Sequence, residues 1–304
     1  MSLPTVGVVV PTRNRPELLR ETLAAISGQD YAGRVETVVV FDQSAPDGHL
    51  AVTDDRRSVR VVSNERTAGL AGARNTGICS LDTELVAFCD DDDTWWPTKL
   101  TAQVAALQRH PDAELACSGI RIRYADTTVD RVLHRERIEL PELLRSRLTE
   151  LHPSTFLIRR RPLVDGFGLV DEDIPGSYAE DYEFLLRAAR SAPLLNVEAV
   201  LVDVRWHQQS YFASRWDTIS TALTWLLDRY PEFRSVPKGE ARVAGQIAFA
   251  HAAAGDRPGA ARWAVRTLRR NPREPRGYLA LAVAGRAVSA DAVLRRLHAR
   301  GKGL

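Results

Sequence analysis

The chain has 304 residues, 44% of them hydrophobic and 26% charged, so it can bury a sizeable core and is not a disordered tail; its length predicts about two domains. The formal net charge of +2 divides unevenly, because residues 210–304 contain 17 Lys and Arg against 7 Asp and Glu, whereas residues 1–209 contain 24 against 32. The acidic front part would repel phosphate groups, and we therefore expect no nucleic-acid partner.

Four short, valine-rich runs in the first ninety residues predict strands that are buried on both faces of a parallel sheet. They are Val6–Val10, Thr37–Phe41, Val59–Val62 and Leu85–Cys89. Helical periodicity predicts helices over Glu17–Ser27, over Leu70–Ser80 and after Pro97. Strands that alternate with helices indicate an open α/β sheet, and ligands bind such sheets beyond the carboxyl ends of the strands.

The pattern loosens after residue 115. It predicts strands over Cys117–Tyr124 and Ser154–Ile158 and a helix over Ala179–Arg190. Beyond about residue 215 the sequence is rich in Ala, Leu and Arg and has helical periodicity. The helices expected there are Thr218–Tyr230, Ala241–Ala254, Gly259–Arg270 and Asp291–His298. We therefore expect one domain over residues 1–210 and a basic helical region over residues 211–304.

The cysteines and the hydropathy pattern predict the compartment. Cys79, Cys89 and Cys117 show no CxxC spacing, which argues against a disulfide framework or a structural zinc site and favours a reducing compartment. The N-terminus lacks the features of a signal peptide, and no run approaches the roughly 20 apolar residues of a membrane span. We expect a cytoplasmic protein. Its basic C-terminal helices either associate with the inner face of a membrane or are a solvated cap or an oligomer interface.

The most unusual feature is the run Asp90–Asp93, which follows the fourth predicted strand. Adjacent carboxylates repel one another and are costly to bury without partners. A divalent cation relieves this repulsion, and oxygen ligands suit Mg²⁺ or Mn²⁺. Because Mg²⁺ completes its coordination with water and substrate phosphates, the run predicts a metal–diphosphate site. The alternative is a solvated acidic turn before the next helix.

Other candidate functional residues lie at strand ends and at one helix start. The first strand leads into PTRNRP (11–16), and Asp42 follows the second. Glu180 and Asp181 begin a predicted helix, where the helix dipole alone favours acidic residues. His207 follows a tryptophan and is either a ligand or a packed structural histidine. The glycines of residues 64–77 fit neither the dinucleotide fingerprint nor a P-loop.

Five of these segments resemble the family 2 glycosyltransferases, which have the GT-A fold. They occur in that family's order over roughly residues 4–210: VVVPTRNRPELL, VVVFDQS, AGLAGARNTG, FCDDDDTWWPTKL and EDYEFLLRAA. The resemblance implies a Rossmann-like, mostly parallel sheet flanked by helices. It also implies an inverting, metal-dependent transferase that moves a hexose-type sugar from a UDP-, GDP- or dTDP-sugar to a hydroxyl group. The acceptor would be a polysaccharide, a lipid-linked molecule or a secondary metabolite.

The resemblance also implies which residues bind the nucleotide part of the donor. Three residues after the first strand would line the nucleotide pocket: Pro11, Thr12 and Arg15. Asp42 would contact the base, and Arg74 and Asn75 would lie near the ribose or the diphosphate. Asp90 and Asp91 would also contribute to donor binding.

The metal ligands and the general base follow from the same resemblance. The acidic run matches the family's DxD motif in either of two registers, Asp90 with Asp92 or Asp91 with Asp92. Asp92 belongs to both registers and is therefore the expected metal ligand, supported by Asp90 and His207 and holding Mn²⁺ or Mg²⁺. Asp181 would be the general base, with Glu180 beside it.

Two other function classes remain open at this stage. A sugar-phosphate nucleotidyltransferase also uses an α/β sheet and acidic metal ligands. It usually has a glycine-rich loop after its first strand, however, where this chain has PTRNRP (11–16). A non-catalytic nucleotide-sugar-binding scaffold would be expected to lack one of the two acidic groups, and this chain has both. Oligomerisation is possible in each case.

Overall fold

The computed structural model describes residues 3–124, 127–206 and 215–298. The chain divides into two compact units. The first comprises residues 1–140, 148–172 and 180–207, and the second comprises residues 141–147, 173–179 and 208–304.

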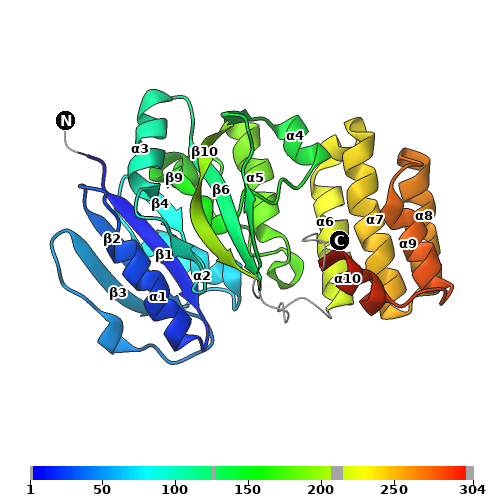
Figure 1. Cartoon of the computed structure of the whole chain (residues 1–304), viewed down its shortest axis with the longest axis horizontal. Coiled ribbons are helices and arrows are strands. Elements are labelled where there is room, and N and C mark those ends of the chain that lie inside the picture. The colour runs from blue at the N-terminus through cyan, green and yellow to red at the C-terminus, as the bar shows by residue number, and fades with distance from the viewer. Residues whose placement is uncertain (1–2, 125–126, 207–214, 299–304) are drawn as a thin grey trace. The chain divides into compact units, whose positions relative to one another are not determined.

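Among the described residues, a mixed sheet of ten strands forms the centre of the first unit (Figure 1). Its strands are β1 Val6–Thr12, β2 Val35–Phe41, β3 Arg57–Ser63, β4 Leu85–Phe88, β5 Thr94–Trp95, β6 Leu115–Tyr124, β7 Thr127–Arg131, β8 Arg137–Ile138, β9 Leu157–Arg159 and β10 Leu194–Arg205. Their order is β3-β2-β1-β4-β9-β6-β10-β5, with β7 on β6 and β8 on β10. The first four strands of this order are parallel, and so are β6 and β10, whereas β9 is antiparallel to both of its neighbours. The expected α/β sheet is confirmed, and its antiparallel pairings lie in the second half.

Both faces of this sheet are covered, which is why every residue of β1 and β4 is buried. Helices α1 (Pro16–Ser27) and α3 (Lys99–Arg109) contribute Leu19 and Leu100 to the core on one face. On the other face, the rings of Phe88, Phe156 and Phe184 contact one another, the last from α5 (Glu180–Ser191). The predicted helix α2 (Leu70–Ser80) is confirmed at both ends.

The second unit is helical, as expected for the C-terminal region. Its helices include α6 Trp216–Arg229, α7 Pro237–Ala254, α8 Arg257–Arg270, α9 Pro275–Ala284 and α10 Ala290–His298, and the short α4 covers Leu140–Arg145. Small side chains such as Ala260, Ala264 and Ala280 let α8 and α9 pack closely on α7 around Phe249. Among the described residues, no helix is long and apolar enough to cross a bilayer.

A buried lysine lies at the start of α3. Lys99 is 0% exposed, its Nζ donates a hydrogen bond to Gln103 Oε1 at 2.7 Å, and it lies 3.9 Å from the centroid of the Trp95 ring. Burial lowers the pKa of Lys99 to about 7, because the charged ammonium loses its hydration.

Lys99→Met should therefore change how stability depends on pH. Above pH 7 the folded wild type has released this proton, while the unfolded chain keeps it up to the ordinary lysine pKa. The free energy of unfolding of the wild type should thus rise relative to that of the variant by about 1.4 kcal/mol per pH unit between roughly pH 7.5 and 9.5. Urea titrations of both proteins across this range measure the difference. A constant difference would show that the lysine does not titrate in the folded state.

Candidate active site

The carboxyl ends of three neighbouring parallel strands bring the first group of candidates together. β1 ends at Thr12 and β2 at Phe41, which are register partners, and Asp42 N donates a hydrogen bond to Thr12 O at 3.0 Å. Cys89 N donates to Val9 O, so the acidic run begins beside the end of β1. Pro11, Thr12 and Asp42 are buried at this edge, as expected for the ligand-binding edge of an open α/β sheet.

The middle of the acidic run is bound by β1 and the loop after it. Asp91 is 6% exposed, and it accepts hydrogen bonds from Thr12 Oγ1 at 2.7 Å and from Arg15 Nη1 at 3.1 Å. The same Arg15 nitrogen lies 2.6 Å from Asp92 Oδ2. Burial raises the pKa of Asp91 to about 6. A guanidinium thus serves as counter-cation to two carboxylates for which we expected a metal ion.

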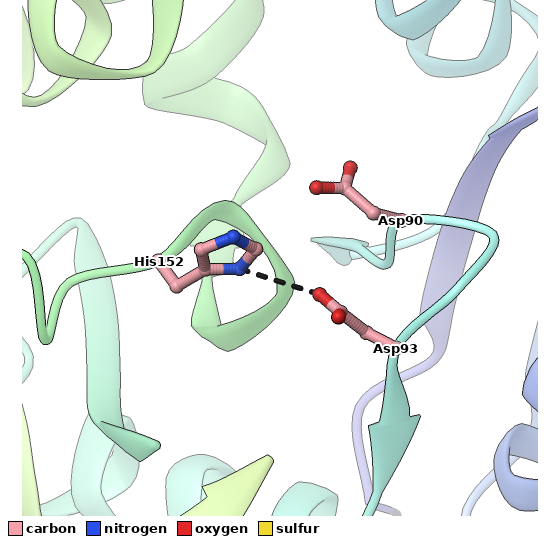
Figure 2. Close-up of side chains that lie close together, drawn as sticks. All are labelled: Asp90, Asp93 and His152. Atoms are coloured by element: carbon pink, nitrogen blue, oxygen red, sulfur yellow. Dashed lines mark ion pairs between the residues drawn. The ribbon is translucent and has the colours of Figure 1, made fainter. Parts of the chain in front are cut away.

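The two ends of the run meet a histidine from a distant loop. Ligand atoms of Asp90, Asp93 and His152 all lie within 4.8 Å of one another, and Figure 2 shows the three side chains grouped together. His152 Nδ1 lies 3.4 Å from Asp93 Oδ2, which also accepts a hydrogen bond from Ser154 Oγ at 2.5 Å. Two carboxylates and an imidazole are a donor set that fits a divalent cation.

Electrostatics differ strongly between the two carboxylates of this cluster. Burial, together with the negative charges of Asp90 and Asp92, raises the pKa of Asp93 well above its usual range. Burial also acts to raise the pKa of Asp90, but the nearby cations, chiefly Arg74, outweigh it and the pKa is lowered. The pKa values of Asp90 and Asp93 move in opposite directions because Asp90 lies near positive charges, whereas Asp93 lies near negative ones.

One buried arginine joins the two acidic groups of the sequence. Arg74 of α2 is 1% exposed, and its Nη2 donates to Asp90 Oδ1 at 2.8 Å while its Nη1 donates to Glu180 Oε1. Burial raises the pKa of Glu180 to about 7, although Arg74 acts in the opposite direction. Arg74 is thus the residue through which the start of α5 is held beside the end of β4.

Asp181 differs from its neighbour in burial and in partners. It is only partly buried, whereas Glu180 is 5% exposed. Its Oδ1 accepts a hydrogen bond from the backbone N–H of Tyr182 at 2.6 Å, in the first turn of α5, where the helix dipole favours a carboxylate. Of the two acids, Asp181 is the one whose side chain is partly open to solvent, as a group that takes a proton from a bound molecule must be.

Asp42 and Asn75, which were also expected to bind the nucleotide, form hydrogen bonds with other residues of the chain. The carboxylate of Asp42 accepts hydrogen bonds from Asn64 Nδ2 at 2.8 Å and from Gly69 N at 3.2 Å. Gly69 has φ 121°, a value that favours glycine, and a Cβ at Gly72 would lie 1.9 Å from Thr67 O. The two glycines of this segment therefore permit a tight turn that closes on Asp42.

Glu172 holds the same turn from the other side and was not among the sequence candidates. Its Oε1 accepts from Arg66 Nε at 2.5 Å and from Asn75 Nδ2 at 2.7 Å, and its Oε2 accepts from Thr67 N at 3.2 Å. Burial acts against ionisation, but these hydrogen bonds lower the pKa of Glu172 to about 2. Asn75 is itself 1% exposed and also pairs with the backbone of Val170.

The structure therefore brings together most of the sequence candidates. His207, the third expected metal ligand, lies outside the described residues. His152, which the structure places beside Asp90 and Asp93, was missed as a ligand because the sequence around it, HPST (152–155), carries no metal-ligand spacing. Glu172 was missed because its partners lie about a hundred residues earlier in the chain.

Comparisons with known proteins agree with this geometry. The family model described as glycosyl transferase family 2 matches residues 7–167. A glycosyltransferase of Rickettsia felis, named as uncharacterized, is 24% identical over 68% of this chain and 35% of its own length. An Escherichia coli protein, UDP-Glc:alpha-D-GlcNAc-diphosphoundecaprenol beta-1,3-glucosyltransferase WfgD, is 28% identical over 34% of this chain and 42% of its own length. The chain thus covers well under half of these two relatives.

Solved structures show the same fold. The structure of S. aureus TarS 1-349 in complex with UDP-GlcNAc has a TM-score of 0.61 and 16% identity, covering 93% of this chain and 91% of that one. The mannosyltransferase PcManGT from Pyrobaculum calidifontis, in complex with GDP-Man and Mn²⁺, has a TM-score of 0.57 and 20% identity, covering 93% and 80%. At these identities the likeness establishes the fold.

Proposed function

The chain belongs to glycosyl transferase family 2, and from that premise we propose that it transfers a sugar from a nucleoside diphosphate donor to an acceptor hydroxyl, with inversion and with a divalent cation. The observation that carries the proposal is the contact of Arg74 with both Asp90 and Glu180. It places the two acidic groups, about ninety residues apart in sequence, at one site. In-line displacement at an anomeric carbon needs one group at the leaving diphosphate and another at the attacking hydroxyl.

The proposed reaction assigns a role to each acidic group. The acceptor oxygen attacks the anomeric carbon, the bond from that carbon to the diphosphate oxygen breaks, and the nucleoside diphosphate leaves from the opposite face. Asp181 accepts the hydroxyl proton as the new bond forms, a contribution of roughly 10²–10⁴-fold. Asp90, Asp93 and His152 would hold a divalent cation, which would supply charge stabilisation at the leaving diphosphate. Arg74 and Glu180 fix the start of α5, and hence Asp181, relative to the acidic run.

We propose that the donor pocket is formed at the ends of β1 and β2. Pro11, Thr12 and Asp42 would face the nucleoside, and Arg15 would exchange its carboxylate partners for the diphosphate. A UDP-, GDP- or dTDP-sugar is the proposed donor class. Two solved structures support this class: that of TarS contains UDP-GlcNAc, and that of PcManGT contains GDP-Man and Mn²⁺. Asn75 and Glu172 would not contact the donor. They would hold in place the turn whose backbone contacts Asp42.

The proposed acceptor is a hydroxyl of a saccharide, including one carried on a lipid diphosphate. The support is the Escherichia coli relative, which is named as a glucosyltransferase that acts on a diphosphoundecaprenol-linked sugar. We also propose a cytoplasmic location. The cytoplasm is the compartment that suits the free thiols of Cys79, Cys89 and Cys117.

Donor turnover followed by proton NMR tests the proposed function. The protein, a sugar nucleotide and Mn²⁺ are incubated with and without saccharide acceptors, and the anomeric signals of the earliest product are assigned. An inverting enzyme yields an anomer opposite to that of the donor. Retention of configuration would contradict the single-displacement mechanism. Binding of the nucleotide without any turnover would favour a non-catalytic scaffold.

Variants of the acidic run and of His152 test how the metal is held. We expect His152→Ala to raise the Mn²⁺ concentration needed for nucleotide binding about 10–100-fold, because the cluster would lose one donor of three. Asp92→Ala should weaken the same Mn²⁺-dependent binding, because Asp92 belongs to both registers of the DxD motif. Calorimetric titrations at graded Mn²⁺ measure both, with His110→Ala, whose imidazole pairs with Glu136 away from the acidic run, as the control. A loss for Asp92→Ala alone would remove His152 from the ligand set.

A further inference from the structure

Residues 257–288 of the second unit present an unusually one-sided charge. This segment covers α8, α9 and the turn after α9, and it contains eight arginines and a single acidic residue, Glu274. Glu274 is only 7% exposed and is used within the unit, where it accepts hydrogen bonds from Arg276 at the start of α9. The exposed surface of this segment therefore carries no carboxylate.

Five of the eight arginines form no ion pair within 4.0 Å among the described residues, although Arg262 is close enough to Asp256 to help lower its pKa. Arg266 and Arg270 pair with Glu240 of α7, which is 4% exposed, and Arg276 pairs with Glu274. The remaining five are all exposed and have no ion pair in the described part of the chain: Arg257, Arg262, Arg269, Arg273 and Arg286. These five guanidinium groups are therefore available to an anionic partner.

The same segment exposes large apolar side chains. Val265 is 45% exposed, Tyr278 54%, Leu281 40% and Val288 41%. They are half of the eight large hydrophobic residues that are exposed in the described part of the chain, in a stretch of 24 residues. Isolated exposed apolar residues are ordinary, but a concentration of them beside unpaired charges marks a contact surface.

On α8, which lies beside α7 (Figure 1), the two kinds of side chain share one face. Arg262, Val265 and Arg269 follow one another at helical spacing, on the face opposite Ala260 and Ala264, which are buried in a cluster with residues of α7. A shallow hollow of about 550 Å³ lies between the arginine side chains, lined by Ala261, Arg262, Val265, Arg266, Arg269 and Arg270. The aliphatic parts of arginine cover apolar surface while their guanidinium groups stay in a polar layer.

We propose that residues 257–288, which we call the α8–α9 surface, bind the surface of a bilayer that contains anionic phospholipid. The arginines without a close ion pair bind the phosphate groups of the lipid headgroups. Val265, Tyr278 and Leu281 insert into the boundary between headgroups and acyl chains. A helix face that combines arginines with exposed apolar residues and lacks acids has the composition of an interfacial helix. A nucleic acid would satisfy the charges but would leave the apolar side chains in water. The inference does not depend on the proposed sugar transfer.

Co-sedimentation of the full chain with vesicles tests the α8–α9 surface, without donor or acceptor, so that its outcome is independent of the transfer reaction. We expect binding to phosphatidylglycerol–phosphatidylcholine vesicles that weakens as salt is raised, and little binding to pure phosphatidylcholine. Arg262→Glu/Arg269→Glu should lower the partition coefficient at least about 25-fold, since one arginine near an anionic surface is worth about 1 kcal/mol, or roughly fivefold. Tyr278→Ser/Leu281→Ser should lower it severalfold with no change in charge.

A control variant distinguishes an effect of the α8–α9 surface on vesicle binding from an effect of the net charge of the protein. Arg109→Glu/Arg161→Glu makes the same change in charge at two exposed arginines of the first unit and should leave vesicle binding within about twofold. Should the charge-reversed variant unfold, Arg262→Gln/Arg269→Gln replaces it. Absence of binding to anionic vesicles, an equal loss in the control, or full binding of the Tyr278→Ser/Leu281→Ser variant would each overturn the proposal.

Discussion

Replacing Asp181 by asparagine should reduce sugar transfer by about 10²–10⁴-fold and leave Mn²⁺-dependent nucleotide binding close to that of the wild type. Asparagine keeps the size of the side chain and its oxygen acceptor for the N–H of Tyr182, but it cannot take up the hydroxyl proton. The expected loss is that of a positioned general base. The fold should be unaffected, because Asp181 is only partly buried.

The measurement is the initial rate at saturating donor, with nucleotide affinity determined separately. Asp165→Asn is the matched control, because Asp165 is exposed and belongs to the same unit. It should keep the wild-type rate. An Asp181→Asn variant that retains more than about a tenth of the wild-type rate would rule this carboxylate out as the base.

Arg74→Met is expected to have the largest effect on stability. It leaves the buried carboxylate of Glu180 and the partly buried carboxylate of Asp90 without their shared counter-charge. Removing one partner of a buried ion pair typically costs 3–5 kcal/mol of unfolding free energy. Burial opposes the charge of Arg74, but Asp90 and Glu180 raise its pKa above the ordinary value, so the wild type keeps this cation over the whole accessible pH range.

Denaturant titrations of Arg74→Met and of the control Arg34→Met measure this cost. Arg34 is exposed and pairs with Glu36 at 3.7 Å, and its loss should cost no more than about 1 kcal/mol. The double variant Arg74→Met/Glu180→Gln should recover part of the lost unfolding free energy, because a neutral amide then replaces one of the two carboxylates that Arg74 contacts. A cost below about 1 kcal/mol for Arg74→Met would mean that the two acidic groups do not depend on this contact.

The elements that the sequence predicted well are those whose pattern is local. The helix over residues 70–80 was predicted to the residue, and the first four valine-rich runs are β1 to β4. β10 was missed because LLNVEAVLVDVR mixes apolar and charged residues without clean alternation. The structure explains this pattern, since the register of β10 against β6 shifts twice between Val197 and Val202. A second element that was not predicted is α9 (Pro275–Ala284), which lies between the helices expected over Gly259–Arg270 and Asp291–His298.

The sequence pointed to the acidic residues of the site, but not to the hydrogen bonds and ion pairs that join them. The acidic run stands out beside a predicted strand end, whereas the roles expected for Asp42 and for the pair at the start of α5 came from the resemblance to the family. No local pattern shows that Arg74 contacts both acidic groups, that Arg15 binds two carboxylates of the run, or that Glu172 holds the turn at Thr67. These contacts join segments far apart in the chain, and only the fold brings them together.

The most direct test of the central claim, a metal-dependent donor site at the carboxyl ends of β1, β2 and β4, is a thermal-shift screen. UDP, GDP, dTDP and CDP are each added with Mn²⁺, Mg²⁺ or EDTA. A ligand that binds only the folded state stabilises it by about 2.7 kcal/mol at 100 times its dissociation constant, which is readily detected. The account predicts a shift for one nucleotide that disappears in EDTA. A shift that persists in EDTA, or no shift for any nucleotide with either ion, would contradict it.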